Sequence, residues 1–176
     1  ITDRPLDVNL KEIAACKKKY PNNAVIISLM VESKKEAWQE IVKRSQDTGA
    51  DGFELNFGCP HGMSERGMGA AMGQVPEYTC MVTEWVKEVS ELPVIVKLTP
   101  NVTHIVPPGK AAQKGGADAV SLINTINSVM GVDVDTLQKM LSEVSSVVML
   151  SFEELGFGHG EDRFMAEDNV ASARPD

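Results

Sequence analysis

The residues of this sequence with the clearest chemical potential are polar side chains that follow short apolar runs. Asn56 follows one such run and opens a glycine-rich loop, 56–69, that carries the thiol of Cys59. Two later apolar runs lead into Lys97 and Thr99, and into Asn124 and Thr125. If the runs are parallel strands, their carboxyl ends share one rim, and ligands of α/β sheets bind there. The sequence therefore predicts one site built from these distant residues.

Each of these residues has an ordinary structural interpretation as well. An asparagine at the end of a strand is often a turn former, and a lone cysteine is often a small buried apolar residue. Glycines at 58, 62, 67 and 69 surround Cys59, and a mobile loop of this kind can close over a substrate. That setting favours Cys59 as a general acid over a packed thiol.

Lys97 lies inside the apolar run 94–98. An ammonium group is costly to bury unless it meets an anion or an electron-rich acceptor. A bound redox cofactor would supply such an acceptor. An ion pair with Glu54 on a neighbouring strand is the alternative.

The spacing of apolar residues predicts strands that alternate with helices, as in parallel βα units. We expect strands over 24–31, 51–55, 94–98 and 119–124. We expect one helix that Asp7 caps and Pro21 ends, a second from Trp38 to Gly49, and a third whose core-facing stripe runs from Tyr78 to Val89. The basic run 17–19 is then the cationic last turn of the first helix.

Later segments give weaker predictions. Pro107, Pro108 and Gly109 would interrupt the helix expected after Thr103, because proline cannot donate a helical hydrogen bond. Over 136–150 we expect a helix and then a strand from Val147. The sequence also repeats Gly-Ala-Asp at 49–51 and 116–118, each time before a strand that ends at an asparagine. Such a repeat is typical of consecutive βα units.

The length limits how much of a barrel this chain can form. It has 176 residues, 43% of them hydrophobic, which is enough for one core, whereas a complete eight-unit barrel needs about 250 residues. We therefore predict the α/β class, with a partial TIM (β/α)8 barrel of about half the βα units over residues 1–150. The Gly-, Glu- and Asp-rich residues 151–176 are expected to form an acidic, poorly ordered tail.

Charge and cysteine content exclude several classes of partner. The formal net charge of -8 argues against nucleic acid and against an anionic membrane, which both require basic patches. Cys16, Cys59 and Cys80 form no CxxC pair, so we expect no metal site or iron-sulfur cluster, and we expect a reduced, cytoplasmic compartment. No apolar segment approaches the roughly 20 residues that span a bilayer, and residues 1–5 do not resemble a signal peptide.

Several short segments resemble the flavin-binding barrel of the dihydropyrimidine dehydrogenases, which are relatives of the dihydroorotate dehydrogenases. The similarity covers about residues 1–135 and is strongest to the separate flavin subunit of the bacterial NAD-dependent form. The segments that carry it are Glu54-Leu55-Asn56, Cys59-Pro60-His61-Gly62-Met63, Glu65-Arg66-Gly67-Met68-Gly69, Lys97-Leu98-Thr99-Pro100-Asn101-Val102-Thr103, Gly115-Gly116-Ala117-Asp118 and Asn124-Thr125. The family's first two strands and its late FMN-phosphate loops are expected to lie outside this sequence.

This resemblance implies an FMN-dependent reduction of uracil or thymine to the 5,6-dihydro base, as in pyrimidine catabolism. Hydride would pass from the flavin to C6 of the base, and Cys59 would protonate C5. Electrons would come from NAD(P)H through a partner that carries flavin and iron-sulfur centres. By the same resemblance, Asn56, Asn124 and Thr125 would bind the pyrimidine, and Lys97, Asn56 and Asn124 would contact the cofactor. Carboxamides suit a ring of alternating carbonyl and N–H groups because they offer both a donor and an acceptor.

A non-catalytic role stays open beside the enzymatic one. A half-barrel with open strand edges could persist as an interaction or assembly fragment. Open edges and an unfilled apolar interior favour pairing with a second copy or with another chain. We therefore expect a homo- or hetero-oligomer.

Overall fold

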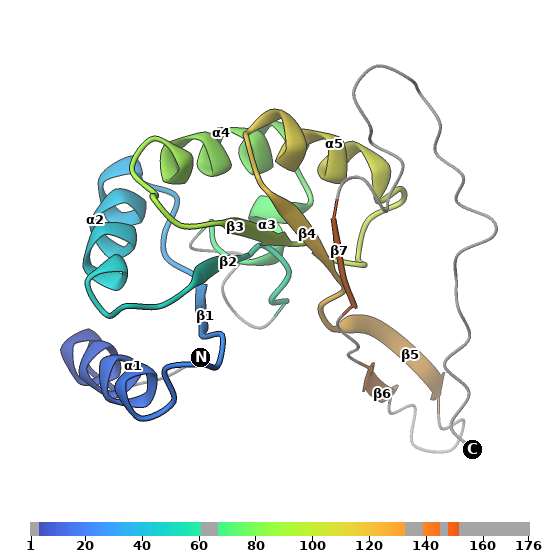
Figure 1. The fold of residues 1–176 in the computed structure, drawn as a ribbon. Helices are drawn as coiled ribbons and strands as arrows, with labels where there is room; N and C mark the ends of the chain where they lie inside the picture. Colours follow the sequence, from blue (N-terminus) through green and yellow to red (C-terminus); the bar gives the residue numbers. More distant parts are fainter. Residues whose placement is uncertain (1–3, 61–66, 133–138, 145–147, 152–176) are drawn as a thin grey trace.

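A mostly parallel sheet with most of its helices packed on one face forms the centre of the molecule (Figure 1). The computed structural model describes residues 4–60, 67–132, 139–144 and 148–151. The helices are α1 (Leu6–Lys19), α2 (Lys35–Gln46), α3 (Ala70–Gly73), α4 (Pro76–Lys87) and α5 (Val106–Lys114). The strands are β1 (Ile26–Leu29), β2 (Gly52–Asn56), β3 (Val94–Lys97), β4 (Ala119–Leu122), β5 (Ile126–Val132), β6 (Lys139–Val144) and β7 (Val148–Ser151).

The sheet has the strand order β1-β2-β3-β4-β7. Its first four strands are parallel and adjacent in chain order, and helices connect them, whereas β7 runs antiparallel to β4. A separate antiparallel pair joins β5 and β6. The α/β prediction is therefore confirmed, and the four consecutive parallel strands correspond to half of an eight-stranded barrel.

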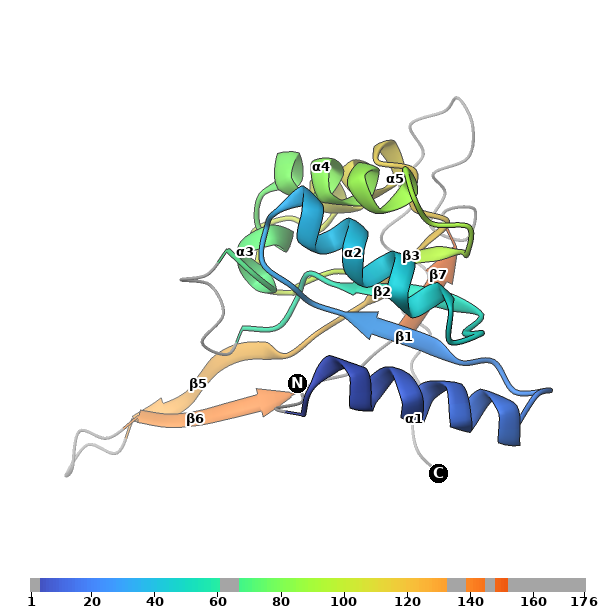
Figure 2. The same cartoon turned by 90° about the vertical axis from the view of Figure 1, so that its left-hand side faces the viewer.

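The core lies between the sheet and the helices α2, α4 and α5, which cover the same face in both views (Figures 1 and 2). Side chains that alternate along the strands fill it, because successive residues of a strand point to opposite faces. The fully buried members from the strands are Phe53, Leu55, Val94, Val96 and Val120, and those from the helices are Trp38, Val42, Val82 and Val86. Burying each of these side chains stabilises the fold by about 1.5–3 kcal/mol.

The predicted stripe of the third helix is confirmed along most of its length. Val82 and Val86 of α4 are fully buried, and Pro76 occupies the first turn as expected. Tyr78, however, is 49% exposed. Its place at the outer margin of the stripe leaves the ring in solvent, so the expectation of core packing is wrong for this residue.

Helix α1 differs from the other long helices because none of its residues is buried. It lies beside β1, on the opposite side from α2 (Figure 2). A hollow of about 730 Å³ between α1 and β1 extends to Asn56. The predicted cap at Asp7 is wrong: Pro5 is the N-cap, and Asp7 lies in the first turn, where its carboxylate pairs with Arg44.

Other boundaries also differ from those predicted. β1 and β4 are shorter than the expected strands, because β1 ends its parallel pairing with β2 at Leu29, and β4 ends its antiparallel pairing with β7 at Leu122. The two prolines do not interrupt α5. That helix begins at Val106, so Pro107 and Pro108 lie in its first turn, where backbone N–H groups have no helical acceptor.

The expected helix within 136–150 is wrong over the residues that can be compared. Residues 139–144 form β6, which pairs with β5, and the expected strand from Val147 is present as β7. Pairing with the preceding strand decides the structure here. The predicted tail, 151–176, lies outside the described residues except for Ser151 at the end of β7. Among the described residues, no helix has the length and apolar character needed to cross a bilayer.

The Gly-Ala-Asp repeat forms the same corner twice at the amino end of the sheet. Asp51 accepts hydrogen bonds from the Val25 amide at 2.7 Å and from Lys17 Nζ at 2.7 Å. Asp118 accepts from the Val94 amide at 2.7 Å and from Lys87 Nζ at 2.8 Å. The preceding Gly49 and Gly116 have φ of 78° and 90°, a region that favours glycine. Both corners join the end of a helix, the start of the next strand and the end of the next helix, which confirms that the units are repeated.

Candidate active site

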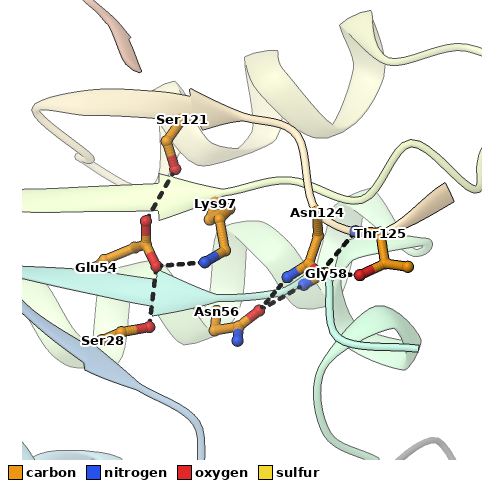
Figure 3. Close-up of polar contacts among 8 residues, drawn as sticks. All are labelled: Ser28, Glu54, Asn56, Gly58, Lys97, Ser121, Asn124 and Thr125. Carbon is orange, nitrogen blue, oxygen red and sulfur yellow. Dashed lines mark hydrogen bonds and ion pairs between the residues drawn. The ribbon is translucent and has the colours of Figure 1, made fainter. Parts of the chain in front are cut away.

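Polar side chains occupy the sheet face opposite the helix-packed core at the carboxyl ends of β2, β3 and β4 (Figure 3). Asn56 is the last residue of β2 and lies opposite Lys97, the last residue of β3. Lys97 in turn lies opposite Ser121 of β4. Partners in register point to the same face, so these three side chains face away from the core.

Two carboxamides meet at this rim. Asn124 Nδ2 donates to Asn56 Oδ1 at 2.9 Å, and the Gly58 amide donates to the same oxygen at 3.2 Å. Asn124 Oδ1 accepts from the Thr125 amide at 2.7 Å and from the Thr125 hydroxyl at 3.2 Å. Asn56 therefore turns its Nδ2 group outward, and within the described chain this group donates no hydrogen bond (Figure 3).

The backbone at the strand ends places these amides. The Phe57 amide donates to the Lys97 carbonyl at 3.0 Å, and the Asn124 amide donates to the Leu98 carbonyl at 3.2 Å. These bonds extend the ladder past the ends of the strands. Asn56 at the end of β2 and Asn124 after β4 therefore lie at the same height along the sheet. The Phe57 ring is fully buried and meets Trp38 edge to face at 5.9 Å. That contact fixes the base of the loop that follows Asn56.

Gly58 permits the close approach of Asn124. A Cβ atom on Gly58 would lie 2.4 Å from Asn124 Cβ, a distance that real contacts do not reach. Any other residue at position 58 would push the Asn124 carboxamide away from Asn56. The glycine is therefore a requirement of the site's geometry.

Cys59 follows Gly58 directly in the chain and is buried, with 8% of its surface exposed. Its carbonyl accepts a hydrogen bond from the Ala70 amide at 3.0 Å, at the start of α3. Gly69 has φ of 57°, and a Cβ atom there would lie 2.5 Å from the Cys59 carbonyl oxygen. The backbone of Cys59 is thus joined to the start of α3. Residues 61–66 of the same loop lie outside the described residues.

Lys97 forms the ion pair that the sequence offered as its alternative. Its Nζ lies 2.7 Å from Glu54 Oε1, and the two side chains are 14% and 12% exposed. Glu54 also accepts hydrogen bonds from Ser28 at 2.9 Å and from Ser121 at 3.2 Å. Lys97 donates only to Glu54 within the described chain, so two of its three N–H groups remain for a ligand.

Sequence reasoning missed Ser28 and Ser121 and treated Glu54 only as a partner of Lys97. The two-residue alternation of β2 could have indicated that Glu54 belongs to the site, because Glu54 and Asn56 lie on the same face of the sheet. Thr99, which was predicted to belong to the rim, is fully buried, and its hydroxyl accepts from the amide of Asn101 at 3.1 Å. Thr99 therefore shapes the turn after β3.

The donors at this rim fit a planar, electron-rich ring. Asn56 Nδ2 and the remaining protons of Lys97 can donate to carbonyl oxygens and ring nitrogens. The sheet face that carries them is the one opposite the helices α2, α4 and α5 (Figures 1 and 2). Across the described residues, no group of three His, Cys, Asp or Glu side chains could hold a metal ion.

Comparison with known proteins identifies the class to which this fold and rim belong. The sequence model of the Dihydroorotate dehydrogenase family matches residues 2–146. The chain therefore belongs to the dihydroorotate dehydrogenase family, a family of flavin-type oxidoreductases built on TIM barrels.

Individual relatives in the family are named as dehydrogenases of dihydropyrimidines or of dihydroorotate. The chain is 46% identical over 138 residues to dihydropyrimidine dehydrogenase (NADP(+)), chloroplastic, of Arabidopsis thaliana, which covers 78% of this chain and 32% of the relative. It is 37% identical over 135 residues to the NAD-dependent dihydropyrimidine dehydrogenase subunit PreA of Escherichia coli K12, covering 77% and 32%. Over 88 residues it is 51% identical to the catalytic subunit of dihydroorotate dehydrogenase B (NAD(+)) of Methanocella arvoryzae, covering 50% and 28%. The chain thus spans about a third of the length of these relatives, and the resemblance to the dihydropyrimidine dehydrogenases is confirmed.

Proposed function

We propose that this chain forms part of an FMN-dependent enzyme that reduces uracil or thymine to the 5,6-dihydropyrimidine. The observation that carries the proposal is the amide pair Asn56–Asn124, which presents N–H donors at the carboxyl end of a parallel sheet. Two relatives whose names specify dihydropyrimidine dehydrogenase support it. The chemistry of the rim supports this choice of substrate, because carbonyl oxygens of a pyrimidine accept what these amides donate.

Each rim residue has a defined task in this proposal. FMN, when bound, supplies the hydride for one carbon of the substrate double bond. Cys59 donates the proton to the other carbon as the general acid. Asn56, Asn124 and Thr125 orient the base through its carbonyl and N–H edge, and Lys97 donates to the flavin ring, which Asn56 and Asn124 also contact.

The charge balance of the rim favours an uncharged base. The ammonium of Lys97 is matched by the carboxylate of Glu54 at 2.7 Å. The described part of the rim therefore offers amides and hydroxyls without a net positive charge. A pyrimidine that bears a carboxylate, such as orotate, would need an additional cation, since burying an unpaired charge is costly.

Reducing equivalents require a second component in this proposal. We infer that NAD(P)H delivers electrons through a partner subunit or domain with flavin and iron-sulfur centres, because this chain has no CxxC pair to hold a cluster. The E. coli relative is named as a subunit, which supports an oligomeric assembly. The three thiols form no disulfide, in keeping with a reducing compartment such as the cytoplasm.

A second candidate function is a non-catalytic assembly unit. Two observations favour it. Among the described residues, β1 has no strand paired on its outer side, and an unpaired strand edge is a template for another chain. None of the residues of α1 is buried. This candidate requires neither flavin nor substrate.

Titration with FMN separates the two candidates. The enzyme proposal expects a shifted flavin absorbance spectrum, co-elution of flavin with protein on gel filtration, and reoxidation of the reduced flavin by uracil or thymine but not by orotate. Reoxidation by orotate alone would reassign the substrate. Absence of flavin binding from the purified protein would refute the enzyme proposal and leave the assembly unit.

A further inference from the structure

The carboxylate of Glu54, on β2, connects its own strand to three others. It accepts hydrogen bonds from Ser28 of β1, Lys97 of β3 and Ser121 of β4 (Figure 3). Two donors reach Oε1 and one reaches Oε2, so both oxygens are used. A carboxylate with this many donors is held in one position.

Packing alone does not require ions at these positions. Ile95 lies two residues before Lys97 on the same face of the sheet, opposite Glu54. It is apolar and only 7% exposed. A buried ion pair is often no more stabilising than apolar residues of similar volume. The pair at Glu54 and Lys97 therefore calls for an explanation beyond stability.

The register of β2 and β3 explains where the ion pair lies relative to the rim. Lys97 lies opposite Asn56, while Glu54 precedes Asn56 by two residues on the same face. The ammonium thus bends back from the rim toward a carboxylate deeper in the sheet, and two of its N–H groups remain for a ligand.

We propose that Glu54 is a positioning residue of this site. It holds the Lys97 ammonium at the carboxyl end of β3 and compensates its charge, so that the flavin ring meets a neutral ion pair and not a bare cation. This inference rests on the proposed function. Its consequence is that Glu54, through Lys97, sets the preference of the site for oxidised over reduced flavin.

The test compares E54Q with D118N in the FMN-loaded protein. Each substitution removes one carboxylate from a lysine, Lys97 at the rim or Lys87 at the opposite end of the sheet. The midpoint potential of the bound flavin is measured against a reference dye, and thermal unfolding of the flavin-free protein is measured in parallel. Without its counter-charge, Lys97 should favour the electron-rich reduced flavin about tenfold more strongly in E54Q, which raises a two-electron potential by about 30 mV. D118N should leave the potential unchanged.

A double-mutant cycle shows whether Glu54 acts through Lys97. In the K97M background, E54Q should change the relative affinity for the two flavin forms by less than about threefold, because the cation that it exposes is absent. Equal potentials for wild type, E54Q and D118N would overturn the inference, and so would an undiminished E54Q shift in the K97M background. Loss of stability in E54Q with an unchanged potential would assign Glu54 a structural role only. Failure of the wild-type protein to bind FMN would refute the proposed function, and the inference with it.

Discussion

The two ends of the sheet use similar polar side chains in different ways. At the amino end, Asp51 and Asp118 each bind a backbone amide and a lysine, and the ammonium of Lys17 also donates to two carbonyl groups. At the carboxyl end, Asn56 and Lys97 keep donors that no described residue accepts. Satisfied polar groups stabilise a fold, whereas donors kept in a fixed direction are ready for a ligand. The difference distinguishes a structural end from the end at which we propose that a ligand binds.

Substitution of Cys59, in the loop after β2, should give the largest effect. If Cys59 is the proton donor, Cys59→Ala retains bound FMN but lowers the rate of pyrimidine reduction by about 10²–10⁴-fold. Stopped-flow measurement of flavin reoxidation by uracil checks this. Cys80→Ala is the matched control: burial, reinforced by Glu84, raises the pKa of the Cys80 thiol, which lies on α4 away from the rim. Equal rates for both variants would exclude Cys59 as the acid.

A methyl group at position 58 should disturb the rim through Asn124. In Gly58→Ala the new Cβ would lie 2.4 Å from Asn124 Cβ, so the carboxamide must move. We expect the affinity for FMN or uracil to fall about tenfold to hundredfold, which equals about 1.4–2.8 kcal/mol. Isothermal titration measures it.

Gly49→Ala provides the comparison at the amino end. Gly49 has φ of 78°, so alanine costs about 1–2 kcal/mol of stability there. Ligand affinity should not change. A ligand defect in Gly49→Ala equal to that of Gly58→Ala would contradict the separation of the two ends.

Removal of one corner carboxylate should affect stability alone. Asp118→Ala leaves the Val94 amide and Lys87 without their acceptor. The expected loss is about 1 kcal/mol, which lowers the Tm of a chain of this size by about 2–4 °C. Differential scanning calorimetry checks the shift. Asn124→Ala should show the reverse pattern, with ligand affinity reduced and Tm changed less.

Acid should weaken the Asp51 corner, and we expect this to be the smallest of these effects. The hydrogen bond from Lys17, together with that from the Val25 amide, holds the pKa of Asp51 below its ordinary value of 3.8. Because the folded state binds this proton less tightly, the contribution to stability is complete above pH 3.8 and is lost as the pH falls through the folded pKa. A hydrogen bond from Lys35 likewise lowers the pKa of Glu88.

Unfolding midpoints measured between pH 7 and pH 2 would show this effect. Asp51→Asn should have a shallower acid dependence than the wild type. An identical slope in both proteins would show that the Asp51 corner does not contribute to acid sensitivity.

Local pattern was sufficient for much of the fold and for the choice of rim residues. The apolar stripe of α4, the four parallel strands and the repeated corners follow from spacing and turn residues along the chain. Asn56, Lys97 and Asn124 could be selected because strand ends in parallel sheets meet at one edge.

The features that sequence reasoning missed depend on partners that the local residue pattern does not identify. Ser28 and Ser121 become part of the site only because Glu54 lies between them in register. β6 was predicted as a helix, since its pairing with β5 has no local signature. The cap of α1 was misplaced because Pro5 could begin that helix without a side-chain acceptor.

The matching geometry of the two Gly-Ala-Asp corners suggests a route to recombination. The lysine and the aspartate are 34 residues apart in the first corner and 31 in the second, and the amide and the aspartate are 26 and 24 apart. Each corner is closed by residues from one helix-strand-helix segment. Such a segment could be exchanged between homologous barrels as a cassette, with the crossover points at the corners, and the ladder of the recipient sheet would be preserved.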